Sequence, residues 1–134
     1  MDEALKKIAS CEAAWDKGEY FSFAVFDTLG RLLGDVRLNR IDKEDLSANL
    51  GYWLRSSATG HGYAALAGRA AIAFGFQALA LKRIELVVAV TNVASLRCAE
   101  RIGAQREGIA RQRIFLQGQS EDAVVYSLIS SDLA

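Results

Sequence analysis

Residues 56–90 read SSATGHGYAALAGRAAIAFGFQALALKRIELVVAV, and the arrangement expected for the rest of the chain is built around this segment. A small, polar loop containing two glycines comes first. Residues 63–79 follow and are apolar almost all round, as expected of a helix packed against a sheet. Residues 83–90 form a nearly continuous β-branched run, which is typical of a strand covered on both faces. The order of strand, glycine-bearing loop and buried helix recurs in phosphate-binding sites.

The residues ahead of this segment predict a helix and then strands. Apolar residues approximate helical spacing from Asp2 to Lys17, and Gly18 stands where such a helix would stop. Tyr20–Phe26 and Leu32–Leu38 are apolar runs joined by a plausible turn, so they predict a hairpin. Alternation of apolar residues from 50 to 54 predicts a third strand.

The residues after the central strand predict a short helix and a closing hairpin. Asn92 is a suitable N-cap for a helix that runs to Ile102, and Gly103 is a natural left-handed terminator. Residues 104–116 and 121–129 then read as two strands of a long hairpin.

Composition sets the broad class. A chain of 134 residues has room for one domain, residues 1–134, with one substantial core. With 51% hydrophobic residues and 24% charged residues, the sequence is far from the composition of disordered chains. Sixteen basic residues balance sixteen acidic ones, so no overall field attracts nucleic acid or an anionic membrane.

Targeting and cysteine signals are weak. Residues 1–10 carry charges that exclude the apolar core of a secretory signal peptide, so we expect a cytoplasmic protein. Residues 64–81 approach the length of a membrane span, but Arg69 and Gln77 interrupt them, and a buried helix fits better. Cys11 and Cys98 have no neighbouring ligands for a metal, and we expect packed thiols and no metal site.

The glycine-bearing loop has two functional interpretations and a structural one. Backbone N–H groups around Gly60 and Gly62, with the positive end of the following helix, are suited to a pyrophosphate, but such turns also occur for steric reasons alone. Residues 60–65 also match the dinucleotide pattern G-x-G-x-x-A, with Glu85 at about the expected distance of 20 residues. That context is unsuitable, because a hairpin comes first and Glu85 starts its strand rather than ending it.

Several motifs agree in order and spacing with one family. They are Gly51-Tyr52-Trp53-Leu54, Gly60-His61-Gly62-Tyr63-Ala64, Arg83-Ile84-Glu85, Asn92-Val93-Ala94-Ser95, Ile102-Gly103-Ala104, Glu107-Gly108 and Arg111. Together they resemble the GNAT superfamily of N-acetyltransferases, and within it the RimJ/RimL-like branch of ribosomal-protein-alanine N-acetyltransferases. The match covers roughly residues 21–133. It implies an α/β (α+β) fold with a mixed, mostly antiparallel twisted sheet flanked by helices.

The resemblance implies acetyl-coenzyme A as the cofactor and a set of residues that bind it. The pyrophosphate would lie on the loop formed by Ala58, Thr59, Gly60, His61, Gly62, Tyr63 and Ala64. Asn92 would bond the pantetheine arm, although simple N-capping is its other reading. Backbone groups from Val88 to Val90 would contact the cofactor and stabilise the oxyanion. The family often has glutamine or arginine where this chain has Ser57, so one phosphate contact is absent.

The catalytic residues implied are fewer. Ser95 matches the position proposed to protonate the departing thiolate, with an ordinary first-turn serine as the alternative. Many relatives have a glutamate where this chain has Asn49, so Glu85 and Glu107 are the remaining candidate bases. A solvated charge is the more common role for such glutamates. His61 is expected to face phosphate or solvent, not to catalyse.

The acceptor is expected to be a primary amine, either a protein N-terminus or a small amine. The resemblance also implies that the family's first strand and helix are missing ahead of residue 2, which leaves part of the acceptor pocket in question. The strand at Tyr20–Phe26 would then be an exposed edge, and we expect a homodimer to cover it. A non-catalytic acyl-coenzyme A-binding module or degenerate relative is the alternative function, and a protein that binds no cofactor is a third.

Overall fold

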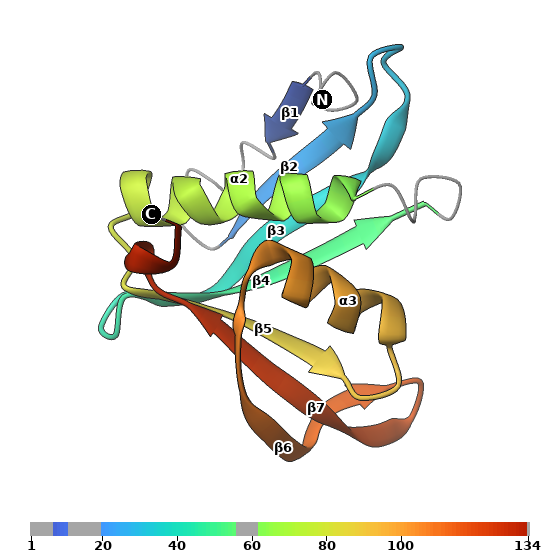
Figure 1. Cartoon of the computed structure of the whole chain (residues 1–134), viewed down its shortest axis with the longest axis vertical. Helices are drawn as coiled ribbons and strands as arrows, with labels where there is room; N and C mark the ends of the chain where they lie inside the picture. The colour runs from blue at the N-terminus through green and yellow to red at the C-terminus, as the bar shows by residue number, and fades with distance from the viewer. Residues whose placement is uncertain (1–6, 11–19, 56–61, 134) are drawn as a thin grey trace.

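The computed structural model describes residues 7–10, 20–55 and 62–133. Within these ranges the chain forms one seven-stranded sheet in the order β1-β2-β3-β4-β5-β7-β6, and only β4 and β5 pair in parallel (Figure 1). The strands are β1 (Lys7–Ser10), β2 (Phe21–Phe26), β3 (Leu32–Asp42), β4 (Ser47–Leu54), β5 (Arg83–Ala89), β6 (Gln105–Leu116) and β7 (Gln119–Leu128). The helices are α2 (Tyr63–Ala78), α3 (Val93–Ile102) and the short 3-10 helix η3 (Ser130–Leu133). The mixed, mostly antiparallel sheet confirms the expected fold class.

The predicted hairpins and helices are confirmed with small changes in their ends. The turn between β2 and β3 is closed by Asp27, whose carboxylate accepts hydrogen bonds from the backbone N–H groups of Leu29 at 2.8 Å and Arg31 at 2.9 Å. Strand β3 runs past Leu38 to Asp42, because its partner β4 pairs with it as far as Asp42 and Ser47. Gly103 has a φ of 94° and ends α3 as predicted.

The helix expected over residues 2–17 is wrong where the structure describes it. Lys7–Ser10 is a strand that pairs antiparallel with β2, from Lys7 opposite Phe26 to Ser10 opposite Phe23. The remainder of that range lies outside the described residues. Unpaired backbone groups at the edge of a sheet bind an extended segment readily, which outweighs a weak helical periodicity. Because β1 covers the edge of β2, the reason given for a homodimer no longer holds.

Both long helices lie on the same face of the sheet (Figure 1). Leu50 of β4 lies against Gly68 of α2, and Tyr52, two residues later on the same strand face, contacts α3. A Cβ atom added to Gly68 would lie 2.9 Å from the Cδ1 atom of Ile102, so glycine lets α2 and α3 approach closely. Alternate residues of the strands, such as Leu38 and Ile84, complete the core at 0% exposure.

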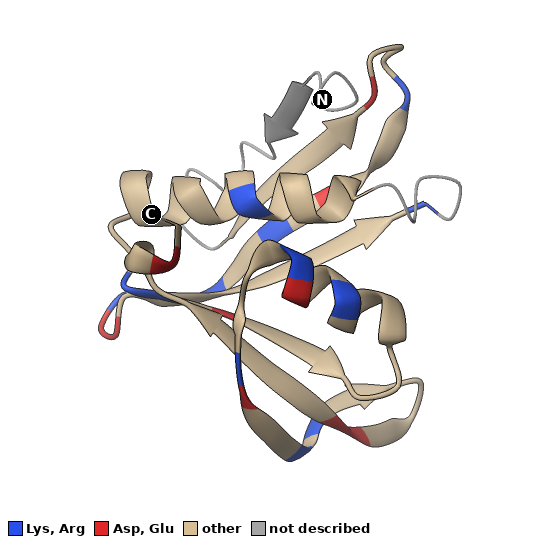
Figure 2. Ribbon diagram, in the orientation of Figure 1, with Lys and Arg blue, Asp and Glu red and all other residues tan. Residues whose placement is uncertain are grey.

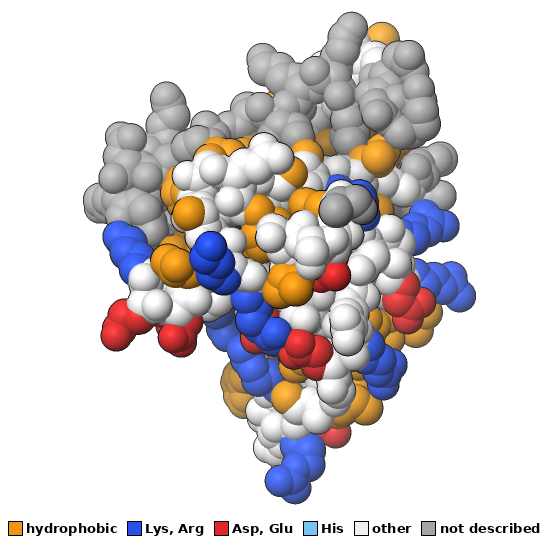
Figure 3. Space-filling view, turned by 60° about the vertical axis from the view of Figure 1, so that its left-hand side comes forward, with side chains coloured by type: hydrophobic (Ala, Val, Ile, Leu, Met, Phe, Trp, Pro, Cys, Tyr) orange, Lys and Arg blue, Asp and Glu red, His pale blue; other side chains and the backbone are white. Residues whose placement is uncertain are grey.

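Charged side chains are distributed without a field of one sign. Basic and acidic residues are scattered along the ribbon (Figure 2), and the face shown in space-filling form mixes both signs with apolar side chains (Figure 3). Helix α2, which includes most of the apolar stretch at residues 64–81, has 16 residues. In the described part of the chain, no helix has both the length and the apolar character needed to cross a membrane.

Strands β3 and β4 approach each other closely at Gly34 of β3, and a substitution there tests this packing. A Cβ atom there would lie 2.0 Å from the carbonyl oxygen of Trp53, whereas a Cβ atom at Gly51 of β4 meets nothing within 4 Å. We expect Gly34→Ala to lower the free energy of unfolding by about 2 kcal/mol or more, because β3 and β4 must separate locally. Gly51→Ala, the matched control, should change it by less than about 0.5 kcal/mol. Urea denaturation measures both, and equal effects would contradict the close approach.

Candidate functional site

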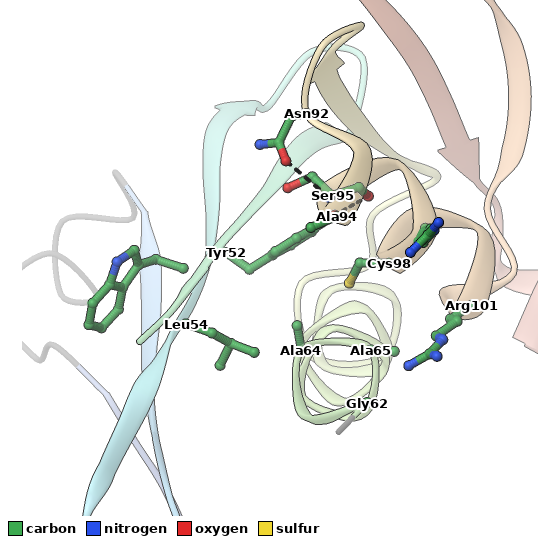
Figure 4. A pocket seen from close by; sticks show the side chains of 12 residues that line it. Tyr52, Leu54, Gly62, Ala64, Ala65, Asn92, Ala94, Ser95, Cys98 and Arg101 are labelled. Atoms are coloured by element: carbon green, nitrogen blue, oxygen red, sulfur yellow. Dashed lines mark hydrogen bonds between the residues drawn. The ribbon is translucent and has the colours of Figure 1, made fainter. Parts of the chain in front are cut away.

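A cavity of about 370 Å³ lies where β4, α2 and α3 meet (Figure 4). Its lining comes from the end of β4, the first turn of α2 and one side of α3. The lining residues are Tyr52, Trp53, Leu54, Gly62, Ala64, Ala65, Asn92, Ala94, Ser95, Arg97, Cys98 and Arg101. The cavity therefore joins segments that lie far apart in the sequence.

The separation of two parallel strands creates the space beside this cavity. Strands β4 and β5 pair only from Ser47 opposite Arg83 to Asn49 opposite Glu85. Beyond that point β4 continues to Leu54 and β5 continues to Ala89, with no pairing between them. Over these last residues, the edges of β4 and β5 that face each other are not paired with each other, so their backbone groups need other partners.

The first turn of α2 forms one end of the cavity. Its N-cap residue, Gly62, has a φ of 77°, a left-handed conformation that glycine adopts at little cost. Gly62 has no side chain with which to cap α2, and the first turn of α2 contains no acidic residue. Tyr63 starts the helix but does not line the cavity, whereas Ala64 does. Of the predicted phosphate loop, Ala58, Thr59, Gly60 and His61 lie outside the described residues.

The start of α3 forms the opposite part of the site. The Asn92 side chain accepts a hydrogen bond from the Ser95 backbone N–H at 3.2 Å, which confirms its N-capping role. The Asn92 side-chain amide nitrogen is not used in that bond. Ser95 also lines the cavity, and its carbonyl oxygen accepts a hydrogen bond from the Tyr52 hydroxyl at 2.9 Å. Tyr52 thus fixes the start of α3 above β4.

Burial keeps two of the lining groups protonated. Loss of water raises the pKa of the Tyr52 hydroxyl and that of the Cys98 thiol, so both are neutral at physiological pH. From the sequence we expected Cys98 to be a packed thiol, and its position in the lining of the cavity was not predicted. The available signal was spacing: Asn92, Ser95, Cys98 and Arg101 recur every third residue, so each lies next to the following one on the surface of the helix.

Backbone direction decides which amides of β5 face the open gap. The Val90 N–H donates to the Asp122 carbonyl at 3.1 Å, so the Val90 backbone faces β7. Because successive backbone N–H groups point to opposite edges of a strand, the amide of Val88 also faces β7 and that of Ala89 faces β4. The contacts predicted at Val88 and Val90 stay predictions, and the register favours Ala89 as the amide donor in the gap.

Glu85 lies on the other face of the sheet, at the point where β4 and β5 separate. Its neighbours Ile84 and Leu86 are buried under the helices, so the Glu85 side chain points away from them. It is the register partner of Asn49, whose Nδ2 atom donates to Asn39 at 3.0 Å. The buried Oδ1 atom of Asn49 has no hydrogen-bond partner among the described residues.

Arg83 forms hydrogen bonds to both candidate bases, Glu85 and Glu107, but in different ways. It bonds Glu107 through both carboxylate oxygens, at 2.6 and 2.8 Å, and Ser127 also donates to Glu107 at 2.7 Å. Hydrogen bonds from Arg83 and Ser127 lower the pKa of Glu107 to about 2, which makes Glu107 a weak base. Arg83 contacts Glu85 only at Oε2, so Oε1 of Glu85 has no donor within the described part of the chain.

Comparison with known proteins gives one consistent family. Residues 1–105 match the acetyltransferase (GNAT) domain. The Bacillus subtilis protein YdaF, which carries the name of a ribosomal N-acetyltransferase, is 35% identical over 103 residues, or 77% of this chain and 56% of YdaF. The probable N-acetyltransferase YjcK of the same organism is 33% identical over 129 residues, or 95% of this chain and 71% of YjcK. This chain therefore spans little more than half the length of YdaF.

A solved structure agrees with these relatives. The Mycobacterium smegmatis RimJ structure, in complex with CoA-disulfide, superposes with a TM-score of 0.83 at 26% identity. The match covers 91% of this chain and 58% of that one. The similarity therefore extends over most of this chain.

The half-buried Tyr52 and the buried Tyr126 provide a test of the hydrogen bond beneath α3. Tyr52→Phe removes the bond to Ser95, and we expect it to lower the free energy of unfolding by about 1 kcal/mol. Tyr126 is 1% exposed, and its hydroxyl has no hydrogen-bond partner among the described residues. Tyr126→Phe should therefore leave stability unchanged or raise it. Guanidinium denaturation compares the two, and a larger loss for Tyr126→Phe would contradict this assignment.

Proposed function

Because the chain belongs to the GNAT family of acetyltransferases, we propose that it transfers an acetyl group from acetyl-coenzyme A to a primary amine by direct attack. The observation that carries the proposal is the cavity that joins the start of α2 to the start of α3, beside the gap between β4 and β5. The acceptor that we propose is a protein N-terminal amine, which fits the ribosomal acetyltransferase name of YdaF, or a small amine.

The residues around the cavity fit the parts of coenzyme A. The N–H groups at the start of a helix suit phosphates, and the start of α2 lines the cavity. The Asn92 side chain offers a hydrogen bond to an amide group of a pantetheine arm. At about 370 Å³ the cavity lies near the lower end of small-molecule pockets, so it would enclose the arm and leave the nucleotide nearer the surface.

Each residue of the site then has a distinct role. Acetyl-coenzyme A supplies the acetyl group as a reactive thioester. The Ala89 N–H is placed to donate a hydrogen bond to the carbonyl oxygen of that group, where negative charge develops. As the new carbon–nitrogen bond forms and the carbon–sulfur bond breaks, the Ser95 hydroxyl gives a proton to the departing sulfur and regains one from solvent water.

Glu85 is the base that we propose for the amine. Its Oε1 atom has no hydrogen-bond donor among the described residues, and its side chain lies at the mouth of the gap on the face opposite the helices. An amine entering from that face would meet Glu85 and Asn49, while the coenzyme would approach from the side of α2 and α3. The cytoplasmic location and the homodimer stay predictions.

Filling the cavity tests the binding site. Ala64 lines the cavity and Ala70 is exposed on the same helix, so Ala64→Trp and Ala70→Trp form a matched pair. We expect Ala64→Trp to weaken acetyl-coenzyme A binding at least about tenfold by occupying the space, and Ala70→Trp to leave it unchanged. Isothermal titration measures both. Equal affinities in the two variants would place the coenzyme elsewhere.

The alternative function is a non-catalytic module that binds coenzyme A. Asn49 favours this alternative, because its amide cannot accept a proton as a carboxylate does. A measurement of turnover distinguishes the enzyme from the module. We expect Ser95→Ala and Glu85→Gln each to lower kcat about a hundredfold, with coenzyme affinity unchanged. Glu44→Gln, in the exposed turn before β4, is the control. Thiol release with a set of peptide and small amines measures the rate. Coenzyme binding without turnover on any amine would support the binding module instead.

A further inference from the structure

A hydrogen-bonded network of four side chains lies on the face of the sheet opposite the helices. Its members are Arg83, Glu85, Glu107 and Ser127. Ser127 of β7 is the register partner of Glu85, and residues opposite each other in antiparallel strands point to the same face. Asn49, the last residue of β4 that pairs with β5, lies on the other side of Glu85. The network therefore borders the gap between β4 and β5.

The guanidinium of Arg83 is shared unequally between the two glutamates. Its Nε and Nη2 atoms both donate to Oε2 of Glu85, at 3.1 and 2.7 Å. Its Nη1 and Nη2 atoms donate to separate oxygens of Glu107, at 2.8 and 2.6 Å. Two parallel bonds, one to each carboxylate oxygen, are a frequent arrangement of an arginine and a carboxylate, and here Glu107 receives them. Oε1 of Glu85 is therefore left without a donor among the described residues.

An irregularity in β6 sets the position of Glu107. Arg106 pairs with Tyr126 and Gly108 pairs with Val125, so Glu107 is the extra residue of a β-bulge. Bulges redirect side chains and are frequent beside functional sites. Ser127, which is 6% exposed, donates to Oε2 of Glu107 at 2.7 Å and holds the carboxylate from the side of β7. The backbone of β6 and a buried serine thus direct Glu107 toward Arg83.

Glu107 holds Arg83 over a wide range of pH. Hydrogen bonds from Arg83 and Ser127 lower the pKa of Glu107 to about 2, so its carboxylate is charged wherever an acetyltransferase assay is run. The arrangement of Arg83 between the two glutamates is therefore present in the protein before any substrate binds.

We propose that Glu107 is a positioning residue for acetyl transfer: by engaging Arg83 through both carboxylate oxygens, it leaves Oε1 of Glu85 free to take the proton of the acceptor amine. The inference rests on the proposed function, in which Glu85 is the base. Without Glu107, the guanidinium would turn to form two parallel bonds with Glu85, and both oxygens of Glu85 would have donors. Hydrogen bonds to the charged form of a carboxylate make it a weaker base, so the transfer would slow.

Glu107→Gln tests the proposal, because glutamine keeps the size of the side chain but only one of its end groups accepts hydrogen bonds. We expect this variant to lower kcat about tenfold and to leave the affinity for acetyl-coenzyme A unchanged. In the Glu85→Gln background, adding Glu107→Gln should lower kcat no further, because Glu107 acts through Glu85. Glu44→Gln, in the exposed turn before β4, is the matched control and should change kcat in neither background.

Ser127→Ala provides a second variant that removes one bond to Glu107 and keeps both bonds from Arg83. We expect a smaller loss of kcat than with Glu107→Gln, and no loss in the Glu85→Gln background. Thiol release at saturating acetyl-coenzyme A and amine measures kcat, isothermal titration measures coenzyme affinity, and urea denaturation verifies that each variant is folded.

The other outcomes overturn the proposal in distinct ways. An unchanged kcat in Glu107→Gln would show that Glu107 does not influence the base. A loss that persists at full size in the Glu85→Gln background would show that Glu107 acts independently of Glu85, and weaker coenzyme binding with unchanged kcat would show that it acts on the coenzyme site. If Glu85→Gln alone left kcat unchanged, Glu85 would not be the base. Absence of turnover in the unchanged protein would overturn the proposed function and this inference together.

Discussion

The separation of β4 and β5 is the constraint on which the site depends. Parallel pairing ends at Asn49 and Glu85, after which the facing edges of both strands are not paired with each other. Backbone N–H and C=O groups left without partners favour a ligand that supplies them. Tyr52, in this unpaired part of β4, contacts the start of α3, so the opening and the cavity lie at the same end of β4.

Close packing of the two helices then decides which side chains meet. Glycine at position 68 lets Ile102 approach α2, and Arg69 holds the end of α3. As a result Asn92 and Ser95 lie at one part of the cavity and Arg101 lies at the start of α2. Residues that act on different parts of a ligand are thus placed by contacts within the protein, which is the condition for a preorganised site.

Charge is arranged differently on the two faces of the sheet. On the helix side, the positive end of α2 and Arg101 are left without acidic partners among the described residues, which suits an anion. On the other side, Arg83 engages both oxygens of Glu107 but one oxygen of Glu85. Such an arrangement separates phosphate binding from proton transfer, because the coenzyme and the amine would approach from opposite faces.

Local signals in the sequence determined most of the elements. The apolar run at 63–78, the β-branched run at 83–89 and the Asn92 and Gly103 caps were predictable, because each depends on neighbouring residues alone. The strand at Lys7–Ser10 was not, since its conformation depends on an edge supplied by β2. Tertiary structure also decided that Ala89 faces the gap, that Cys98 lines the cavity and that Arg101 lies beside Gly62. These placements depend on register and helix packing, which bring together residues that carry no information about each other along the chain.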